Sequence, residues 1–103
     1  MEEKDFALRL ATLRTKKGVS ARDMSLSIGQ NPGYINNIES GKSSPSLAGI
    51  FYICEYLGIT PSEFFDIDVE NPEKLKWIIE DLKKLKDKQL DTIATLVKDL
   101  INK

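Results

Sequence analysis

The chain has 103 residues, of which 41% are hydrophobic and 30% are charged, and its net charge is −1. These values are typical of one small globular domain with an appendage. No apolar run is long enough to span a bilayer, and the polar start Met1–Asp5 does not resemble a secretory signal. The single cysteine, Cys54, cannot form an internal disulfide. We therefore expect a cytoplasmic protein.

Several classes of enzyme are disfavoured by composition. The chain contains no histidine and one cysteine, so it lacks the usual nucleophile–base pairs and zinc sites. No Gly-rich phosphate loop occurs, and the acidic residues are scattered. We expect no catalytic residue, no metal, no cofactor, no small-molecule substrate and no membrane partner.

Apolar residues recur with helical spacing, and no segment shows the sustained alternation of a strand. The pattern therefore predicts an all-α protein. The first helix is expected from about Asp5 to Lys17, and Gly18 ends it. Its inner face contains Phe6, Leu10 and Leu13.

A second helix begins soon afterwards. Ser20 and Asp23 match the spacing of a capping box, in which each side chain satisfies a backbone N–H at the start of a helix. Gly29 is suited to the left-handed residue that ends this helix.

A third short helix follows one tight turn. Asn31 is predicted to cap it, with Pro32 at its first position. Ile35 and Ile38 face inward, and Gly41 ends the helix. Two short helices with a Gly turn between them form a helix-turn-helix unit, whose second helix can enter the major groove of DNA.

Two further helices complete the first part of the chain. Ser46 is a predicted cap for a helix that stops at Gly58, and the segment Thr60–Glu63 is a second capping box that opens a short helix ending at Phe65. The apolar positions of the longer helix are Leu47, Ile50, Phe51, Ile53, Cys54 and Leu57.

The segment from about Leu8 to Phe65 resembles the lambda-repressor-like (Cro/repressor, XRE) helix-turn-helix family. The resemblance implies a five-helix domain and a role in DNA binding. The matching residues are Leu13-Arg14, Gly18-Val19-Ser20, Met24, Ile28-Gly29, Tyr34-Ile35, Ile38–Lys42, Pro45–Leu47, Leu57–Ile59 and Glu63–Phe65.

The third helix is the candidate reader of DNA. An Asn amide can both donate to and accept from adenine, so Asn36 and Asn37 either read bases or are ordinary polar surface residues. Tyr34 either offers its hydroxyl to a phosphate or packs inward, and Gly33 lets the backbone approach DNA closely. The residues expected to bind DNA are Arg22, Asn31, Gly33, Tyr34, Asn36, Asn37, Lys42 and Ser43.

The sequence departs from the family pattern at positions that often carry long polar side chains. Pro32 and Gly33 offer no side-chain donor at the start of the third helix, and Ala21 stands where family members frequently have a phosphate-binding Gln. Arg22 is a substitute for that contact, and Lys42 with Ser43 and Ser44 is suited to another phosphate. Loop and cap chemistry is the alternative for the two serines.

Basic residues gather near the first three helices, although the net charge is not basic. They form either a DNA-facing surface or ordinary solvated charges. Glu39 is expected to be a structural partner of Arg14, and Cys54 a small buried hydrophobe. The basic set is Arg9, Arg14, Lys16, Lys17, Arg22 and Lys42.

We expect a boundary after Ile67, with a DNA-binding domain in residues 1–67 and a helical hairpin in residues 68–103. Asn71-Pro72 starts one of its helices and Asp87 is predicted to cap the other. Both carry an apolar stripe at helical spacing. The hairpin either forms a homodimer interface or folds against its own first and fifth helices.

The leading hypothesis is a sequence-specific transcriptional regulator, most simply a repressor, that binds double-stranded operator DNA as a dimer. The rival hypothesis is a helical protein-interaction module, antitoxin-like or an anti-repressor, with weak or no DNA binding. The departures at Ala21, Pro32 and Gly33 favour the rival, whereas the placement of the basic residues favours DNA.

Overall fold

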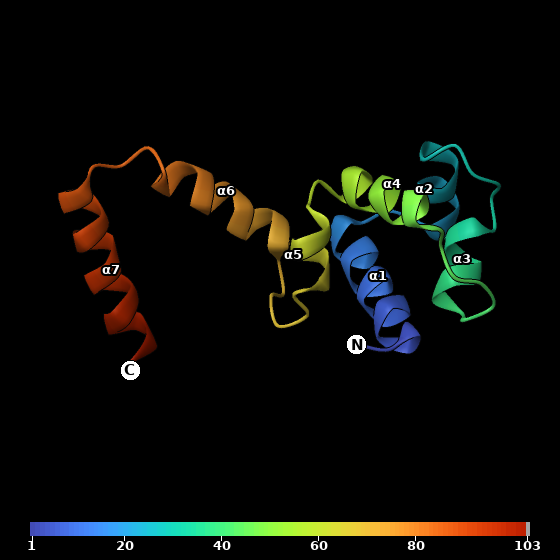
Figure 1. Cartoon of the computed structure of the whole chain (residues 1–103), viewed down its shortest axis with the longest axis horizontal. Coiled ribbons are helices and arrows are strands. Elements are labelled where there is room, and N and C mark those ends of the chain that lie inside the picture. The colour runs from blue at the N-terminus through green and yellow to red at the C-terminus, as the bar shows by residue number, and fades with distance from the viewer. Residues whose placement is uncertain (103) are drawn as a thin grey trace. The chain divides into compact units, whose positions relative to one another are not determined.

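A computed structural model describes residues 1–102, and every regular element in them is an α-helix, so the predicted all-α class is confirmed. The chain divides into two compact units, Met1–Glu73 and Lys74–Lys103. Figure 1 shows the helices in chain order. They are α1 (Glu3–Lys17), α2 (Ala21–Ser27), α3 (Tyr34–Glu39), α4 (Leu47–Leu57), α5 (Pro61–Phe65), α6 (Pro72–Leu82) and α7 (Asp87–Ile101).

The first unit folds around one apolar core to which all five of its helices contribute. The predicted inner face of α1 is confirmed, and the aromatic rings of Phe6 and Phe64 lie 4.8 Å apart between their centroids. Burial of the core side chains is the main favourable contribution to the free energy of folding, because helices this short are not stable by themselves. The core consists of Phe6, Leu10, Leu13, Met24, Ile35, Ile38, Ile53, Cys54, Leu57, Ile59 and Phe64.

Local caps set the helix ends largely as the sequence predicts. The Ser46 hydroxyl accepts from the N–H of Gly49 at 3.0 Å, and Thr60 with Glu63 forms the full reciprocal capping box. Helix α1 begins two residues earlier than expected, because the N–H of Glu2 donates to the Asp5 carboxylate at 2.8 Å.

One face of α4 differs from the expectation for a core helix. Ile53, Cys54 and Leu57 are buried, but Leu47 and Phe51 are 68% and 52% exposed. They lie one turn apart, so they form an apolar strip on the outer side of this helix.

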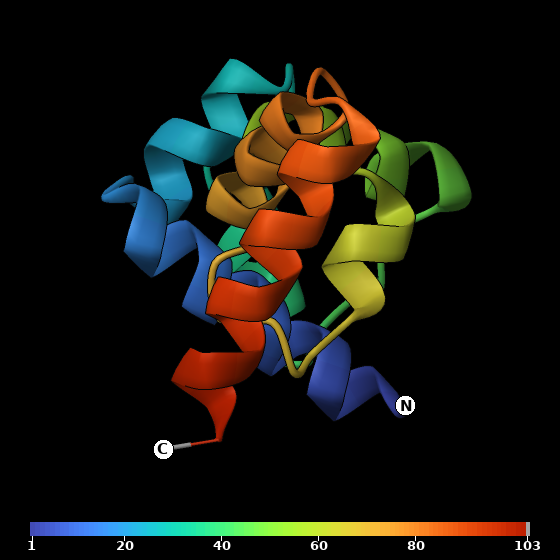
Figure 2. The same cartoon turned by 90° about the vertical axis from the view of Figure 1, so that its left-hand side faces the viewer.

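The second unit carries α7 and all but the first residues of α6. A turn at residues 83–86 joins the two helices, and Figure 2 shows α7 as one continuous helix. Asp87 is the first residue of α7 and not its cap, because the helix already begins after Lys86, whose N–H donates to the Gln89 side chain at 2.9 Å. No side chain of α7 is buried, and Ile78, Val97 and Leu100 are about half-exposed.

No helix within residues 1–102 combines the length and the apolar character that crossing a bilayer requires. The same residues contain no group of three His, Cys, Asp or Glu side chains arranged to hold a metal ion.

Candidate DNA-binding surface

The helix-turn-helix unit consists of α2, the turn at residues 28–33, and α3, and Figure 1 shows the two helices joined by this turn. The predicted capping box of α2 is confirmed in part: the Ser20 hydroxyl accepts from the N–H of Asp23 at 3.0 Å, but the reciprocal bond from the Ser20 N–H to the Asp23 carboxylate is not formed. Gly29 has φ +77°, the left-handed conformation expected of it. This glycine lets the chain leave α2 and turn sharply toward α3.

The predicted start of α3 is wrong by two residues. Asn31 does not cap the helix, and Pro32 is not its first residue, because residues 31–33 form a separate turn. In this turn the Asn31 side chain accepts from the N–H of Gly33 at 3.1 Å, and the Asn31 carbonyl accepts from the N–H of Tyr34 at 3.1 Å. The helix therefore begins at Tyr34, with Gly33 as its capping position.

The end of α3 is tied to the loop that follows it. The carbonyl of Asn37 accepts from the N–H of Lys42 at 2.9 Å and from the N–H of Ser43 at 3.2 Å. Gly41 has φ +80°, which permits this reversal. The backbone of Lys42 and Ser43, two of the residues expected to bind DNA, is thus fixed against the last turn of α3.

The predicted site side chains differ in exposure. Asn31, Asn36 and Ser43 are exposed, whereas Asn37 and Gly33 are half-buried. Asn36 is therefore the amide on α3 that is most open to a ligand.

Tyr34 packs inward, which was one of its two predicted orientations. It is half-buried against the core, and burial raises the pKa of its hydroxyl. A Cβ placed on Gly49 would lie 2.5 Å from the Tyr34 hydroxyl oxygen, so a side chain at residue 49 would require the Tyr34 ring to shift.

Part of the basic cluster predicted from the sequence is held within the fold. Arg9 is 5% exposed, and its guanidinium donates to backbone carbonyls near the end of α5 and in the following connector. Burial lowers the pKa of Arg9, and the nearby Asp66 carboxylate acts in the opposite direction. The accepting carbonyls are those of Glu63 at 3.0 Å, Phe64 at 2.7 Å, Asp66 at 2.9 Å and Val69 at 2.8 Å.

Three more members of that cluster have protein partners. Arg14 pairs with Glu39, and the Lys16 ammonium donates to the carbonyl of Glu70. The Lys17 ammonium lies 5.7 Å from the centroid of the Tyr56 ring. These contacts are made within the first unit, and the Lys16 and Lys17 side chains remain exposed to solvent.

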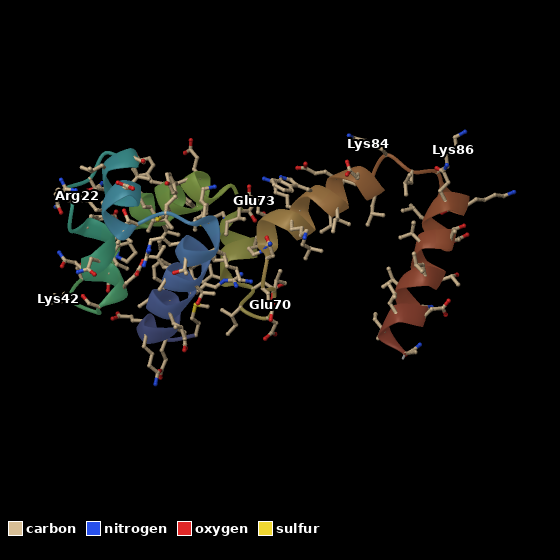
Figure 3. All side chains as sticks on the ribbon, turned by 180° about the vertical axis from the view of Figure 1, so that it is seen from behind. Arg22, Lys42, Glu70, Glu73, Lys84 and Lys86 are labelled. Atoms are coloured by element: carbon tan, nitrogen blue, oxygen red, sulfur yellow. The ribbon has the colours of Figure 1, made fainter. Side chains whose placement is uncertain are left out.

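Arg22 and Lys42 are the members of the cluster that remain open. Both side chains are exposed, and neither forms a hydrogen bond or ion pair with residues 1–102. Figure 3 shows both at the side of the first unit formed by α2 and α3, whereas Glu70 and Glu73 lie at its opposite end. Two open cations therefore lie on the side of this unit that carries the candidate reading helix.

Sequence reasoning missed the roles of two buried polar residues. Arg9 lies between Phe6 and Leu13 on the inner face of α1, and this spacing was a signal that it points inward. Ser25 is fully buried and contacts α3, and its spacing of four residues from Ala21 and three from Ile28 was likewise a signal that it points inward.

Comparison with known proteins agrees with this geometry. A family model described as helix-turn-helix matches residues 10–64, which is more than half of the chain. No curated protein sequence matches the chain. The crystal structure of the clp gene regulator ClgR from Corynebacterium glutamicum is similar in fold, with a TM-score of 0.58 and 24% sequence identity. That similarity covers 80% of this chain and 86% of the ClgR chain.

The match extends from α1 through α5 and includes the two helices and the turn described above. The chain therefore belongs to the Cro/C1-type (XRE) helix-turn-helix family of DNA-binding transcriptional regulators.

Proposed function

We propose that this protein binds operator DNA in a sequence-specific manner as a dimer and acts as a cytoplasmic repressor by blocking polymerase. The observation that carries the proposal is the arrangement around α3. An exposed amide, Asn36, projects from a helix that is flanked by two exposed cations without a protein partner within residues 1–102, Arg22 and Lys42. Base-edge and phosphate contacts need these two kinds of group side by side.

In this proposal each group has a separate task. Arg22 and Lys42 neutralise phosphates, which supplies affinity but little sequence information. Asn36 reads a base edge in the major groove, with adenine as the partner best matched to an amide. Ser43, held beside the end of α3, donates to a phosphate, and Gly33 allows the backbone to come close to the DNA.

A dimer is proposed because both C-terminal helices carry apolar faces that the single chain leaves open. Leu75, Ile78 and Ile79 on α6 are 42%, 49% and 42% exposed. On α7, Val97 and Leu100 are 45% and 58% exposed. A second copy would cover these faces in a symmetric interface. It would also bring a second α3 to the next half-site, about 34 Å away along the DNA.

Selection of bound fragments from the parent genome, followed by mobility-shift titration, tests the proposal. The wild-type chain should select a two-fold-related site and bind it less tightly as salt rises, because bound phosphates release counterions. Arg22→Ala and Lys42→Ala should weaken binding to all sequences and flatten the salt dependence. Lys88→Ala, an exposed lysine of α7, is the matched control and should leave the salt dependence unchanged.

A protein-interaction module is the competing function, and the outer strip of α4 favours it. Leu47, Phe51 and Tyr52 are 68%, 52% and 51% exposed, and apolar strips of this kind often mark contact surfaces. Absence of any DNA binding by the wild-type chain at low salt would reject the proposed function and favour this alternative.

A further inference from the structure

Helix α3 begins without a side-chain cap of its own. Its capping position is Gly33, which has no side chain, and the Asn31 amide is engaged in the preceding turn. The first N–H groups of an α-helix have no partner within the helix and must find one elsewhere. For Ile35, the second residue of α3, that partner is the Ser25 hydroxyl of α2, at 2.9 Å.

The Ser25 hydroxyl is fully committed to this arrangement. It donates to the carbonyl of Ala21 at 2.7 Å, which leaves its oxygen oriented to accept from Ile35. Ser25 and Ile35 are both 0% exposed, so water cannot replace either bond. A buried hydrogen bond with both partners satisfied favours one arrangement of the two helices over others.

The position of this bond matters because α3 has only six residues. A helix of this length is not stable by itself and takes its direction from the groups that hold it. Asn36 directly follows Ile35, so a change at the first turn of α3 moves the amide relative to the rest of the surface.

We propose that Ser25 is a positioning residue for DNA recognition. It caps α3 from the neighbouring helix and thereby fixes where Asn36 meets a base edge. This inference rests on the proposed DNA-binding function. It assigns to a residue that does not touch DNA a share of the specificity and none of the general affinity.

The test compares Ser25→Ala with Ser27→Ala in the full chain. Ser27 lies on the same helix but is exposed, so the two variants make the same chemical change and differ in the buried bond. Binding is measured to the tightest selected genomic fragment and to a scrambled duplex of equal length. Ser25→Ala should weaken binding to the selected fragment by about tenfold, with little change on the scrambled duplex. Ser27→Ala should change neither.

A second readout does not depend on DNA. Amide hydrogen exchange of Ile35, measured by NMR on the DNA-free chain, should become about tenfold faster in Ser25→Ala. The amide of Ile53, in the core of α4, should be unaffected. Ser25→Cys, which keeps a side chain of similar size but a weaker acceptor, should give intermediate values in both experiments.

The outcomes separate this inference from the proposed function. If the wild-type chain binds no DNA, the proposed function fails, and so does the role of Ser25 in recognition, whereas the exchange data still show whether Ser25 holds α3. Equal weakening on both duplexes, or unchanged exchange at Ile35, would overturn the inference. Failure of both Ser25 variants to fold would assign the residue to folding alone and would also overturn it.

Discussion

Arg14 and Glu39 form a paired contact between α1 and α3. The Arg14 Nε donates to Oε2 of Glu39 at 2.7 Å, and Nη2 donates to Oε1 at 2.9 Å. The remaining Nη1 donates to the carbonyl of Val19 at 2.9 Å, and the bonds to Glu39 raise the pKa of Arg14. The predicted structural role of Glu39 is thus confirmed, and on this side α3 is bound to α1.

Replacement of Glu39 by glutamine should destabilise the first unit. The Glu39 and Arg14 side chains are only 12% and 19% exposed. Loss of the carboxylate therefore leaves the Arg14 guanidinium without a charged partner at a site that water solvates poorly. We expect the free energy of unfolding, measured by urea denaturation, to fall by about 2 kcal/mol. Glu55→Gln, on the exposed side of α4, is the control and should change it by less than about 0.5 kcal/mol. Equal effects of the two variants would show that the pair contributes no net stability.

Replacement of Asn36 by alanine should reduce discrimination between DNA sequences. Its amide is exposed and has no structural task that the alanine variant would remove. If it reads a base, the variant loses about 1–3 kcal/mol of binding free energy on the selected site and much less on a scrambled duplex. Titration of both duplexes at one salt concentration measures the difference. Equal losses would mean that Asn36 only contacts the backbone.

Local chemistry explains why so much of the fold follows from the sequence. The caps at Ser20, Ser46 and Thr60 join residues three positions apart, so the partners can be recognised in the chain itself. The start of α3 was predicted incorrectly because the Asn31 side chain serves an equally local alternative, a turn that ends at Gly33.

The candidate site was harder to predict because its supports join distant residues. The Ser25–Ile35 bond spans ten positions, and the bond from Arg9 to the carbonyl of Val69 spans 60. No local pattern marks such partners. For the same reason, the sequence did not show which basic residues are open: Arg9 and Arg14 are long side chains whose guanidinium groups bind partners within the first unit.

Replacement of Gly33 by alanine tests whether a glycine is required here for stability or for DNA binding. Gly33 has φ −91°, which alanine adopts without strain, and an added Cβ would lie 3.8 Å from its nearest neighbours, an ordinary contact. Stability should therefore stay the same or rise by up to about 1 kcal/mol in thermal unfolding. If the backbone approaches DNA here, affinity for the selected site should nevertheless fall. Unchanged affinity would place residue 33 away from the DNA.

Charges placed on the open faces of α6 and α7 should prevent self-association. We expect the wild-type chain to sediment as a dimer at micromolar concentration, and Ile78→Glu and Val97→Glu to sediment as monomers, because a buried unpaired carboxylate is costly. The control is Leu8→Glu, at a position 69% exposed on α1, which should remain dimeric. The monomeric variants should still bind a single half-site weakly. A monomeric wild-type chain would remove these helices from any dimer interface.

The Cys54 thiol should make stability depend on alkaline pH. Cys54 is 2% exposed, and burial raises its pKa from 9.0 to about 11, because the thiolate is poorly solvated in the core. The unfolded chain therefore loses its proton first as pH rises, and the stabilisation present below pH 9 declines between about pH 9 and pH 11. By pH 10 this decline should amount to about 1 kcal/mol. Cys54→Ala, although less stable from lost packing, should lack this part of the decline. Urea denaturation of both proteins at pH 8 and pH 10 measures it, and parallel declines would show that the folded core accommodates the thiolate without cost.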